Sequence, residues 1–184
     1  MPDQTNCFLG EKIFKLLSPD QYCPNILDID VSVLKEQGVK GIILDLDNTL
    51  VPRREKIVSP AVINWIEQMK AKGLKVVIVS NNWTKRVTTV AERVKLPLIA
   101  PAGKPSRRAF KKGLKILGTS PEETAVIGDQ LFTDIIGGKR MRLFTILVSP
   151  VGNDEMFHTR VLRRLERRIL NRLRIKNKVE NDSK

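Results

Sequence analysis

Short runs of apolar residues recur along the middle of the chain, and each run ends abruptly at polar residues. The runs cover residues 41–44, 75–79, 98–100, 125–128 and 144–148. Short apolar runs with many β-branched residues are typical of strands buried on both faces, as in a parallel sheet. The pattern therefore predicts the strands of a buried parallel sheet.

The segments between these runs show the helical spacing of apolar positions. Ser59 and Pro60 form a favourable cap and first-turn pair for a helix that ends near residues 72–73. Further helices are predicted at residues 84–95, 106–117 and 131–140. The alternation of strands and helices favours the α/β class, as a Rossmann-like, three-layer, doubly wound parallel sheet.

The chain has 184 residues, which is enough for one well-buried core but too few for two large domains. We expect the α/β core at residues 41–150. Residues 1–40 are predicted to form a lead-in helix and turn that pack on or near this core. Residues 151–184 are predicted to form a basic amphipathic helix followed by a disordered tail.

Two acidic residues, Asp45 and Asp47, follow the first apolar run. Side chains two positions apart on an extended segment point the same way, and ligands of such sheets bind at the carboxyl ends of the strands. Neighbouring carboxylates repel each other unless a cation or a shared proton compensates. The pair indicates a metal-assisted site in which one carboxylate attacks and the other handles protons. The structural alternative is a turn whose acids cap a helix.

A second acidic cluster follows a later apolar run. Gly128 permits a tight turn, and Asp129 and Asp134 lie at the strand end and in the turn after it. Mg²⁺ binds a few carboxylate oxygens, and water and phosphate oxygens complete its octahedral shell. Together with Asp45 and Asp47, these acids predict a Mg²⁺ site with room for a phosphate.

Groups that can bind phosphate oxygens follow two other runs. Ser80 and Asn81 offer a hydroxyl and an amide, although an ordinary turn or helix cap is the commoner use of such residues. Lys104 lies in a loop bounded by prolines, where a single lysine is usually a solvated charge. Each signal is weak alone, and their order along the chain is the stronger indication.

That order of acid pair, serine, lysine and Gly-Asp acids resembles the haloacid dehalogenase superfamily of phosphohydrolases across residues 40–150. Residues 45–49 fit the D-x-D-x-T motif of that family completely. The resemblance implies that Asp45 is a nucleophile that forms an aspartyl-phosphate intermediate. It also implies that Asp47 protonates the leaving oxygen and then activates the hydrolytic water.

The same resemblance implies where Mg²⁺ and phosphate bind. The metal ligands would be Asp45, the backbone carbonyl of Asp47 and Asp129, with Asp134 beside them. Ser80 and Lys104 would hold the phosphoryl oxygens and neutralise developing charge. Phosphoryl transfer depends mainly on such positioning and charge neutralisation.

No segment of the sequence can supply the cap domain that covers the site in many family members that act on small metabolites. Such a cap would lie either between residues 51 and 59 or between Ser80 and Lys104. The first gap is a short loop, and the second holds one helix and one strand, whereas a domain needs at least about 50 residues. An open site favours a substrate with its own bulk, such as a protein, nucleic acid or lipid surface.

The charge of the chain is strongly positive and uneven. Its formal net charge is +13, and from His158 onward ten basic residues face three acidic ones. In this segment apolar residues fall on one side at helical spacing and arginines mainly on the other. A basic amphipathic helix suits an anionic membrane surface. The alternative is that its apolar stripe packs on the core.

Nucleic acid is another possible ligand of the basic face. However, no aromatic residues lie between the arginines to provide a stacking platform for bases.

The N-terminal segment and the cysteines indicate an intracellular protein. The apolar pattern at residues 8–17 is too short to span a bilayer and lacks an N-terminal positive charge, so we expect it to dock on the core or lie on a membrane. Cys7 and Cys23 have no CxxC spacing and are interpreted as reduced thiols. We expect a cytoplasmic protein, peripheral on the inner face of the membrane. The sequence leaves its oligomeric state open.

Within the superfamily, the chain is most similar to the capless subclass III branch of phosphatidylglycerophosphate phosphatases. The similar motifs are residues 45–51, 79–82, 128–134, 137–138 and 160–169. The resemblance implies hydrolysis of an anionic phospholipid, phosphatidylglycerophosphate, to phosphatidylglycerol, with no specific nucleic acid partner. The alternatives are a phosphatase for a phosphoprotein or nucleotide, or a non-catalytic nucleic-acid-binding adaptor.

Two arginines mark a candidate contact to the substrate. Arg53 and Arg54 lie in the short loop after the D-x-D-x-T motif, where family members place a flap over the site. Their guanidinium groups could bind a second phosphate in the substrate through bidentate hydrogen bonds. The alternative is that both are solvated in an exposed loop.

Overall fold

The computed structural model of the protein describes residues 15–151, and its compact α/β unit begins at Pro19. Residues 1–14 and 152–184 lie outside the described part. The predicted basic helix and most of the N-terminal apolar segment therefore stay predictions.

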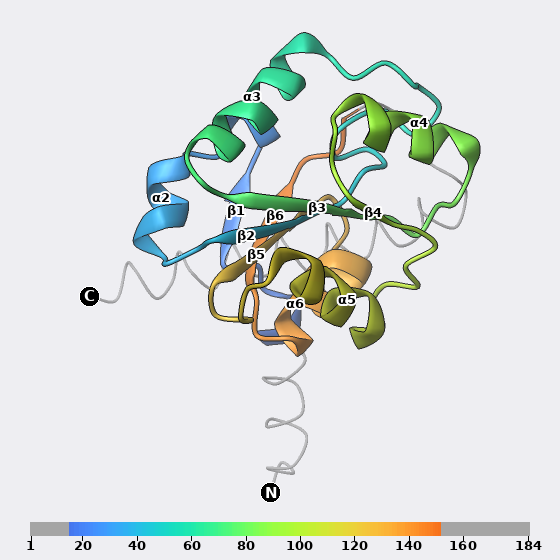
Figure 1. Cartoon of the computed structure of the whole chain (residues 1–184). Helices are drawn as coiled ribbons and strands as arrows, with labels where there is room; N and C mark the ends of the chain where they lie inside the picture. Colours follow the sequence, from blue (N-terminus) through green and yellow to red (C-terminus); the bar gives the residue numbers. More distant parts are fainter. Residues whose placement is uncertain (1–14, 152–184) are drawn as a thin grey trace, which may run out of the picture. The chain divides into compact units, whose positions relative to one another are not determined.

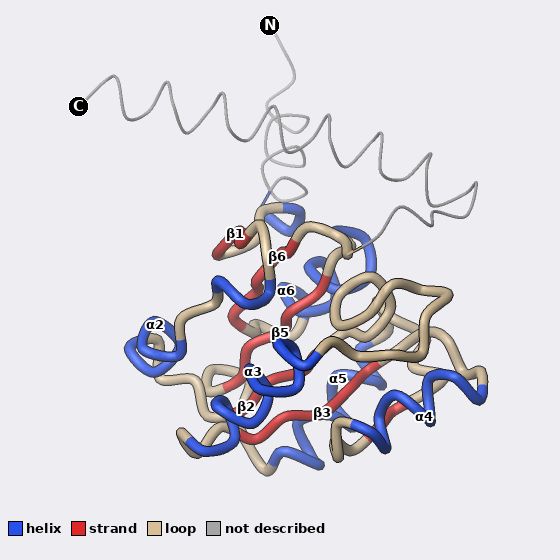
Figure 2. Tube along the Cα trace, turned by 90° about the horizontal axis from the view of Figure 1, so that it is seen from above, coloured by secondary structure: helices blue, strands red, loops and turns tan. Residues whose placement is uncertain are grey.

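A parallel sheet of six strands forms the centre of this unit. The strands are β1 (Gln21–Cys23), β2 (Gly41–Leu44), β3 (Lys75–Val79), β4 (Leu98–Ile99), β5 (Thr124–Gly128) and β6 (Phe144–Val148). Their spatial order is β1-β6-β5-β2-β3-β4, and every pairing is parallel. Figure 2 shows the order β1-β6-β5-β2-β3 across the sheet. From β2 the chain builds outward through β3 and β4, then returns to add β5 and β6 on the other side. This arrangement confirms the doubly wound sheet.

Helices connect the strands and begin where the sequence predicts. They are α2 (Val31–Glu36), α3 (Pro60–Ala71), α4 (Lys85–Arg93), α5 (Arg107–Leu117) and α6 (Ile136–Arg140), with short turns η1 (Ile26–Asp28) and η2 (Leu131–Ile135). The Ser59 hydroxyl accepts a hydrogen bond from the Val62 amide at the start of α3. The helix predicted at residues 131–140 is present, but its first turn, η2, has the wider π-helical form.

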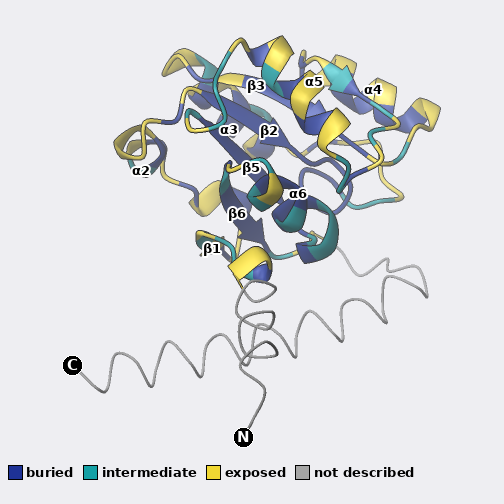
Figure 3. Cartoon of the chain, turned by 90° about the horizontal axis from the view of Figure 1, so that it is seen from below, coloured by how far each residue is buried: buried dark blue, intermediate teal, exposed yellow. Residues whose placement is uncertain are grey.

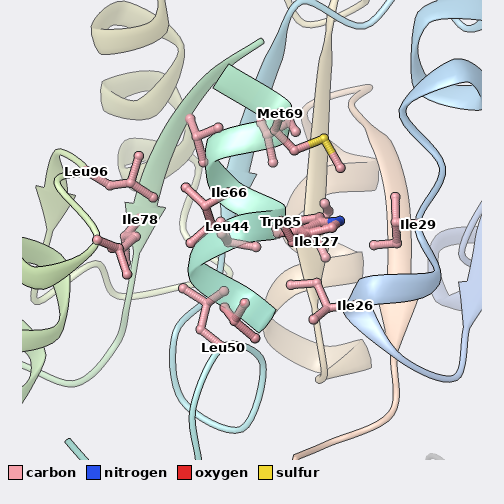
Figure 4. Packing of buried hydrophobic residues seen from close by; sticks show 14 of the residues in the cluster. Ile26, Ile29, Leu44, Leu50, Trp65, Ile66, Met69, Ile78, Leu96 and Ile127 are labelled. Atoms are coloured by element: carbon pink, nitrogen blue, oxygen red, sulfur yellow. The ribbon is translucent and has the colours of Figure 1, made fainter. Parts of the chain in front are cut away.

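The helices cover both faces of the sheet, as Figure 1 shows, with α3 and α4 on one face and α5 and α6 on the other. Along β2, Ile42 and Leu44 pack in one core cluster and Ile43 packs in the other. Figure 4 shows the first cluster, in which Trp65 and Ile66 of α3 lie over the sheet. In Figure 3 the central strands are buried while the outer helix surfaces are exposed. Because successive residues of a strand pack on opposite faces and both faces are buried, the strands appear as continuous apolar runs in the sequence.

The double glycine of α6 lets this helix approach its neighbours closely. A Cβ atom on Gly137 would overlap the ring of Phe110 from α5. A Cβ atom on Gly138 would overlap Val126 of β5 and Thr145 of β6. The two glycines are therefore required by packing rather than by an unusual backbone conformation.

Strand β1 is a feature that the sequence analysis misses, because only a lead-in helix and turn are predicted before residue 41. Its three residues pair in parallel with β6. Asp20 anchors it, because one carboxylate oxygen accepts hydrogen bonds of 2.8 Å from both the amide and the hydroxyl of Thr145. Three residues at a sheet edge are too few to show a period of two, so the pattern has no signal there.

Candidate active site

The predicted acids meet at the carboxyl ends of the two central strands, β2 and β5. These strands are adjacent, and the chain leaves them toward opposite sides of the sheet, which is where ligands bind in doubly wound folds. Asp45, Asp129 and Asp134 are buried, and one carboxylate oxygen from each lies within 4.8 Å of the others. Three carboxylates at this spacing fit a hard divalent cation.

Lys104 reaches into this acidic cluster, although it lies 59 positions after Asp45 in the chain. Its ammonium nitrogen lies 2.6 Å from Asp45 Oδ1 and 2.6 Å from Asp134 Oδ1. Burial lowers the pKa of Lys104, but the two carboxylates raise it by more, so the net pKa lies above its ordinary value. Lys104 is therefore a fixed positive charge inside the site.

Thr49 and Gly128 position the acids. The Thr49 hydroxyl donates a hydrogen bond of 2.9 Å to Asp45 Oδ2 and lies 3.4 Å from Asp129 Oδ1. A Cβ atom on Gly128 would overlap the carboxylate of Asp134, so only glycine allows this approach. Burial, partly opposed by Lys104, raises the pKa of Asp134 above its ordinary value.

Ser80 and Asn81 follow β3, but their described contacts differ from a simple phosphate cradle. The Asn81 side chain accepts a hydrogen bond of 2.7 Å from the Lys104 amide and donates one of 3.0 Å to the Lys104 carbonyl. Asn81 thus holds the loop that carries Lys104. The buried Ser80 hydroxyl accepts a hydrogen bond from the Asn82 amide. Phosphate binding by either residue stays a prediction.

The Asp47 carboxylate lies outside the three-acid cluster and forms an ion pair with Arg86 of α4. This placement leaves Asp45, Asp129 and Asp134 as the candidate carboxylate ligands, so a contact from Asp47 to a metal would use its backbone carbonyl. Arg86 is 9% exposed, and its Nη1 also donates a hydrogen bond of 2.8 Å to the carbonyl of Glu55. Burial lowers the pKa of Arg86, while the charge of Asp45 raises it.

Sequence reasoning missed Arg86. The signal was present, since Arg86 shares the inward face of α4 with Val87, Val90 and Ala91. An arginine on an apolar helical stripe needs a buried partner, because burying an unpaired charge is costly.

Asn48 orders the start of the loop between Asp47 and α3. Asn48 adopts a left-handed backbone conformation with φ of 60°, which Asn tolerates better than most residues. Its side-chain oxygen accepts a hydrogen bond from the Arg53 amide. The predicted contact residues lie in this loop: Arg53 is partly buried and Arg54 is exposed.

Neither predicted gap holds a cap. Residues 52–59 form a loop, and residues 81–103 contain only α4, β4 and their connections. Within residues 15–151, none of the helices has the length and apolar character needed to cross a bilayer.

The comparisons with known proteins agree with this geometry. Residues 52–142, which begin just after the D-x-D-x-T motif, match the model of haloacid dehalogenase-like hydrolases. The probable phosphatase YqeG of Bacillus subtilis is 45% identical over 166 residues, which cover 90% of this chain and 96% of that protein. The chain belongs to the haloacid dehalogenase superfamily of phosphatases.

More distant relatives of this haloacid dehalogenase phosphatase share its fold or part of its sequence. Phosphatidylglycerophosphate phosphatase 1, chloroplastic/mitochondrial, of Arabidopsis thaliana is 29% identical over 154 residues, which cover 78% of this chain but only 44% of that protein. The cobalt-bound deoxy-D-mannose-octulosonate 8-phosphate phosphatase of Haemophilus influenzae has a TM-score of 0.52 at 15% identity. That match covers 62% of this chain and 70% of the other, and it supports the fold.

Proposed function

We propose that this phosphatase hydrolyses phosphomonoesters through an aspartyl-phosphate on Asp45, with Mg²⁺ as its cofactor. The observation that supports this most is the contrast between the two motif acids. Asp45 lies among the other acids and is neutralised by Lys104, whereas the carboxylate of Asp47 lies apart and is held by Arg86. Two carboxylates in different environments suit two different roles.

In the proposed reaction, one carboxylate oxygen of Asp45 attacks the phosphorus atom as the ester oxygen leaves. Asp47 protonates the leaving oxygen and later accepts a proton from the water that hydrolyses the intermediate. Thr49 and Lys104 fix the Asp45 carboxylate at 2.9 and 2.6 Å, so its approach to phosphorus is preorganised. Lys104, with Ser80, would also bind the phosphoryl oxygens.

The carboxylates of Asp45, Asp129 and Asp134 would hold the Mg²⁺. When bound, the cation would neutralise charge on the phosphoryl group. Haloacid dehalogenase phosphatases generally use a divalent metal, and the oxygen-only donor set suits Mg²⁺.

For the substrate, we propose the lipid phosphatidylglycerophosphate, which would yield phosphatidylglycerol. The partial similarity to phosphatidylglycerophosphate phosphatases supports this choice. So do the short connections at residues 52–59 and 81–103, which contain no cap domain over the site. Arg53 and Arg54 would contact the internal phosphodiester of this lipid.

A screen of phosphate release tests the proposal. Purified full-length protein would be assayed with Mg²⁺ on lipid, nucleotide, sugar and phosphopeptide monoesters, with Asp45→Asn as the matched control. We expect the highest kcat/KM for phosphatidylglycerophosphate and no release by the variant. A clear preference for another class would refute the lipid assignment, and tight RNA binding without any phosphatase activity would favour an adaptor.

A further inference from the structure

Two large apolar side chains lie exposed next to the site. Trp83 is 76% exposed and Ile57 is 68% exposed, more than any other large apolar residue in the described part of the chain. The other tryptophan, Trp65, is only 6% exposed and packs in the core. Neither exposed residue belongs to a core cluster, so burial within the described core does not account for them.

Both residues lie in loops that leave the same edge of the sheet. Ile57 follows β2 in the loop before α3, and Trp83 lies between β3 and α4, while β2 and β3 are adjacent parallel strands. The hydrogen bond from Arg86 of α4 to the Glu55 carbonyl ties the loop after β2 to the helix that begins two residues after Trp83. Figures 1 and 2 both show the loop after β2 beside α4. We name residues 53–57 and 83–85 the exposed rim.

The charge of the exposed rim is strongly positive. Its four cationic residues outnumber its one acid, Glu55: they are Arg53, Arg54, Lys56 and Lys85. Tryptophan with lysine and arginine is the composition of surfaces that sit at the boundary between lipid headgroups and acyl chains. Anionic headgroups also attract such cationic side chains.

We infer that the exposed rim docks on an anionic membrane, with Trp83 and Ile57 entering the headgroup boundary. This inference rests on the proposed function, because it explains how an uncapped site meets a phosphomonoester in a bilayer. Docking at this edge of the sheet would place the carboxyl ends of β2 and β5 toward the lipid. The rim then acts as the membrane contact of the same site.

Tryptophan fluorescence of the full-length protein tests this contact locally, since Trp65 is buried and Trp83 is the exposed reporter. The probes are vesicles of phosphatidylcholine with equal phosphatidylglycerol, vesicles of phosphatidylcholine alone, and brominated lipid as a quencher. The variants are Trp83→Ser, Ile57→Ser and their combination. The matched control is Ile116→Ser, because Ile116 is 49% exposed near the end of α5, which runs back to the start of β5.

With the anionic vesicles, we expect the tryptophan emission to shift to the blue and to be quenched by brominated lipid. Trp83→Ser should abolish both changes. The double variant should reduce the vesicle-bound fraction about tenfold, as expected for two apolar side chains leaving a partly buried state. Ile116→Ser should bind like the natural protein. Turnover of a soluble aryl phosphate should be unchanged in all of these variants.

Different outcomes of these experiments distinguish the proposed membrane contact from the proposed function. Turnover of the lipid without any Trp83 response, or equal loss of binding in Ile116→Ser, would overturn the exposed rim and leave the proposed function intact. A full Trp83 response without hydrolysis of the lipid would support the rim and refute the substrate. A response to RNA but not to vesicles would overturn membrane docking.

Discussion

At the scale of single residues, the two motif acids lie in different surroundings, as the proposed division into a nucleophile and a proton-transfer group requires. Asp45 is bonded by Thr49 and Lys104 within the acidic cluster, and Asp47 pairs with Arg86 outside it. Because these contacts fix both side chains before substrate arrives, little reorganisation is needed during the reaction.

The first prediction concerns the nucleophile and the metal. Asp45→Asn should abolish phosphate release, because an amide is a poor nucleophile and a weaker cation ligand. Asp47→Asn should lose about 10² to 10⁴ in rate, the usual contribution of a proton-transfer group. Chelation of divalent cations should stop the natural enzyme, and added Mg²⁺ should restore it. Full activity of Asp45→Asn with Mg²⁺ present would rule out the mechanism.

Arg86 is predicted to act by positioning Asp47. Arg86→Gln should lower kcat by about 10²-fold, the scale of a misplaced catalytic group, with a smaller change in KM. Arg86→Lys should recover only part of kcat, because lysine lacks the planar fork that reaches both Asp47 and the Glu55 carbonyl. If Arg86 works through Asp47, the double variant Asp47→Asn/Arg86→Gln should be little slower than Asp47→Asn alone. Fully multiplicative losses, or a loss explained by unfolding in a thermal melt, would contradict this role.

Gly128 offers a test of geometry without a change in charge. Gly128→Ala should displace Asp134, since the added methyl would overlap its carboxylate. We expect a higher Mg²⁺ concentration for half-maximal activity, measured by metal titration. Gly73→Ala is a control for glycine replacement, because no atom lies near its added Cβ although its φ of +85° also disfavours alanine. Unchanged metal dependence in Gly128→Ala would show that Asp134 does not contribute to the metal site.

At the scale of elements, one side chain, Asp20, reinforces the pairing of edge strand β1 with β6. Asp20 accepts hydrogen bonds from Thr145 and from Lys139, which reach it from β6 and α6. Although burial raises the pKa of Asp20, these contacts lower it by more, so the pKa lies below its ordinary value. The ionised form is therefore favoured by the folded state.

Asp20→Ala should reduce the free energy of unfolding by about 1–3 kcal/mol, because the buried Thr145 donors lose their acceptor. Since the folded pKa is depressed, the ionised group contributes fully above its unfolded pKa of about 3.9 and loses that contribution as pH falls through the lower folded value. The difference between the proteins in denaturant unfolding should thus shrink below about pH 4. Glu67→Ala, which breaks an exposed pair with Lys70, should cost about 0.5 kcal/mol or less. A pH-independent difference would show that the charge of Asp20 contributes nothing.

At the scale of the whole molecule, the proposed substrate contacts lie in a loop at one edge of the sheet. Replacing Arg53 and Arg54 together with Ala should reduce kcat/KM for phosphatidylglycerophosphate far more than for a small aryl phosphate. Bidentate contacts to the internal phosphodiester would be lost in the first case only. Parallel assays on both substrates measure the ratio. Equal losses would mean that the arginines support the loop instead of recognition.

The sequence alone was sufficient to predict five of the six strands, most helices and the acids that the structure brings together. Strands buried on both faces leave continuous apolar runs, Ser59 leaves a capping signal, and Asp45 and Asp129 follow strand ends directly. These features are local in the chain, so the periodicity of apolar residues and the residue types at turns reveal them. The acids could be assigned to one site because parallel strands bring their carboxyl ends to one edge.

Only the tertiary structure determined which side chains meet. Arg86 forms an ion pair with Asp47, 39 positions earlier in the chain. The Asn81 side chain, predicted to bind phosphate, forms hydrogen bonds with the backbone of Lys104. Strand β1 exists through its pairing with β6 and not through any pattern of its own. In the sequence Trp83 cannot be distinguished from a core tryptophan, and only the fold shows that its side chain is exposed. Such contacts depend on how distant segments pack together, and the local sequence pattern of a segment does not indicate which other segment it contacts.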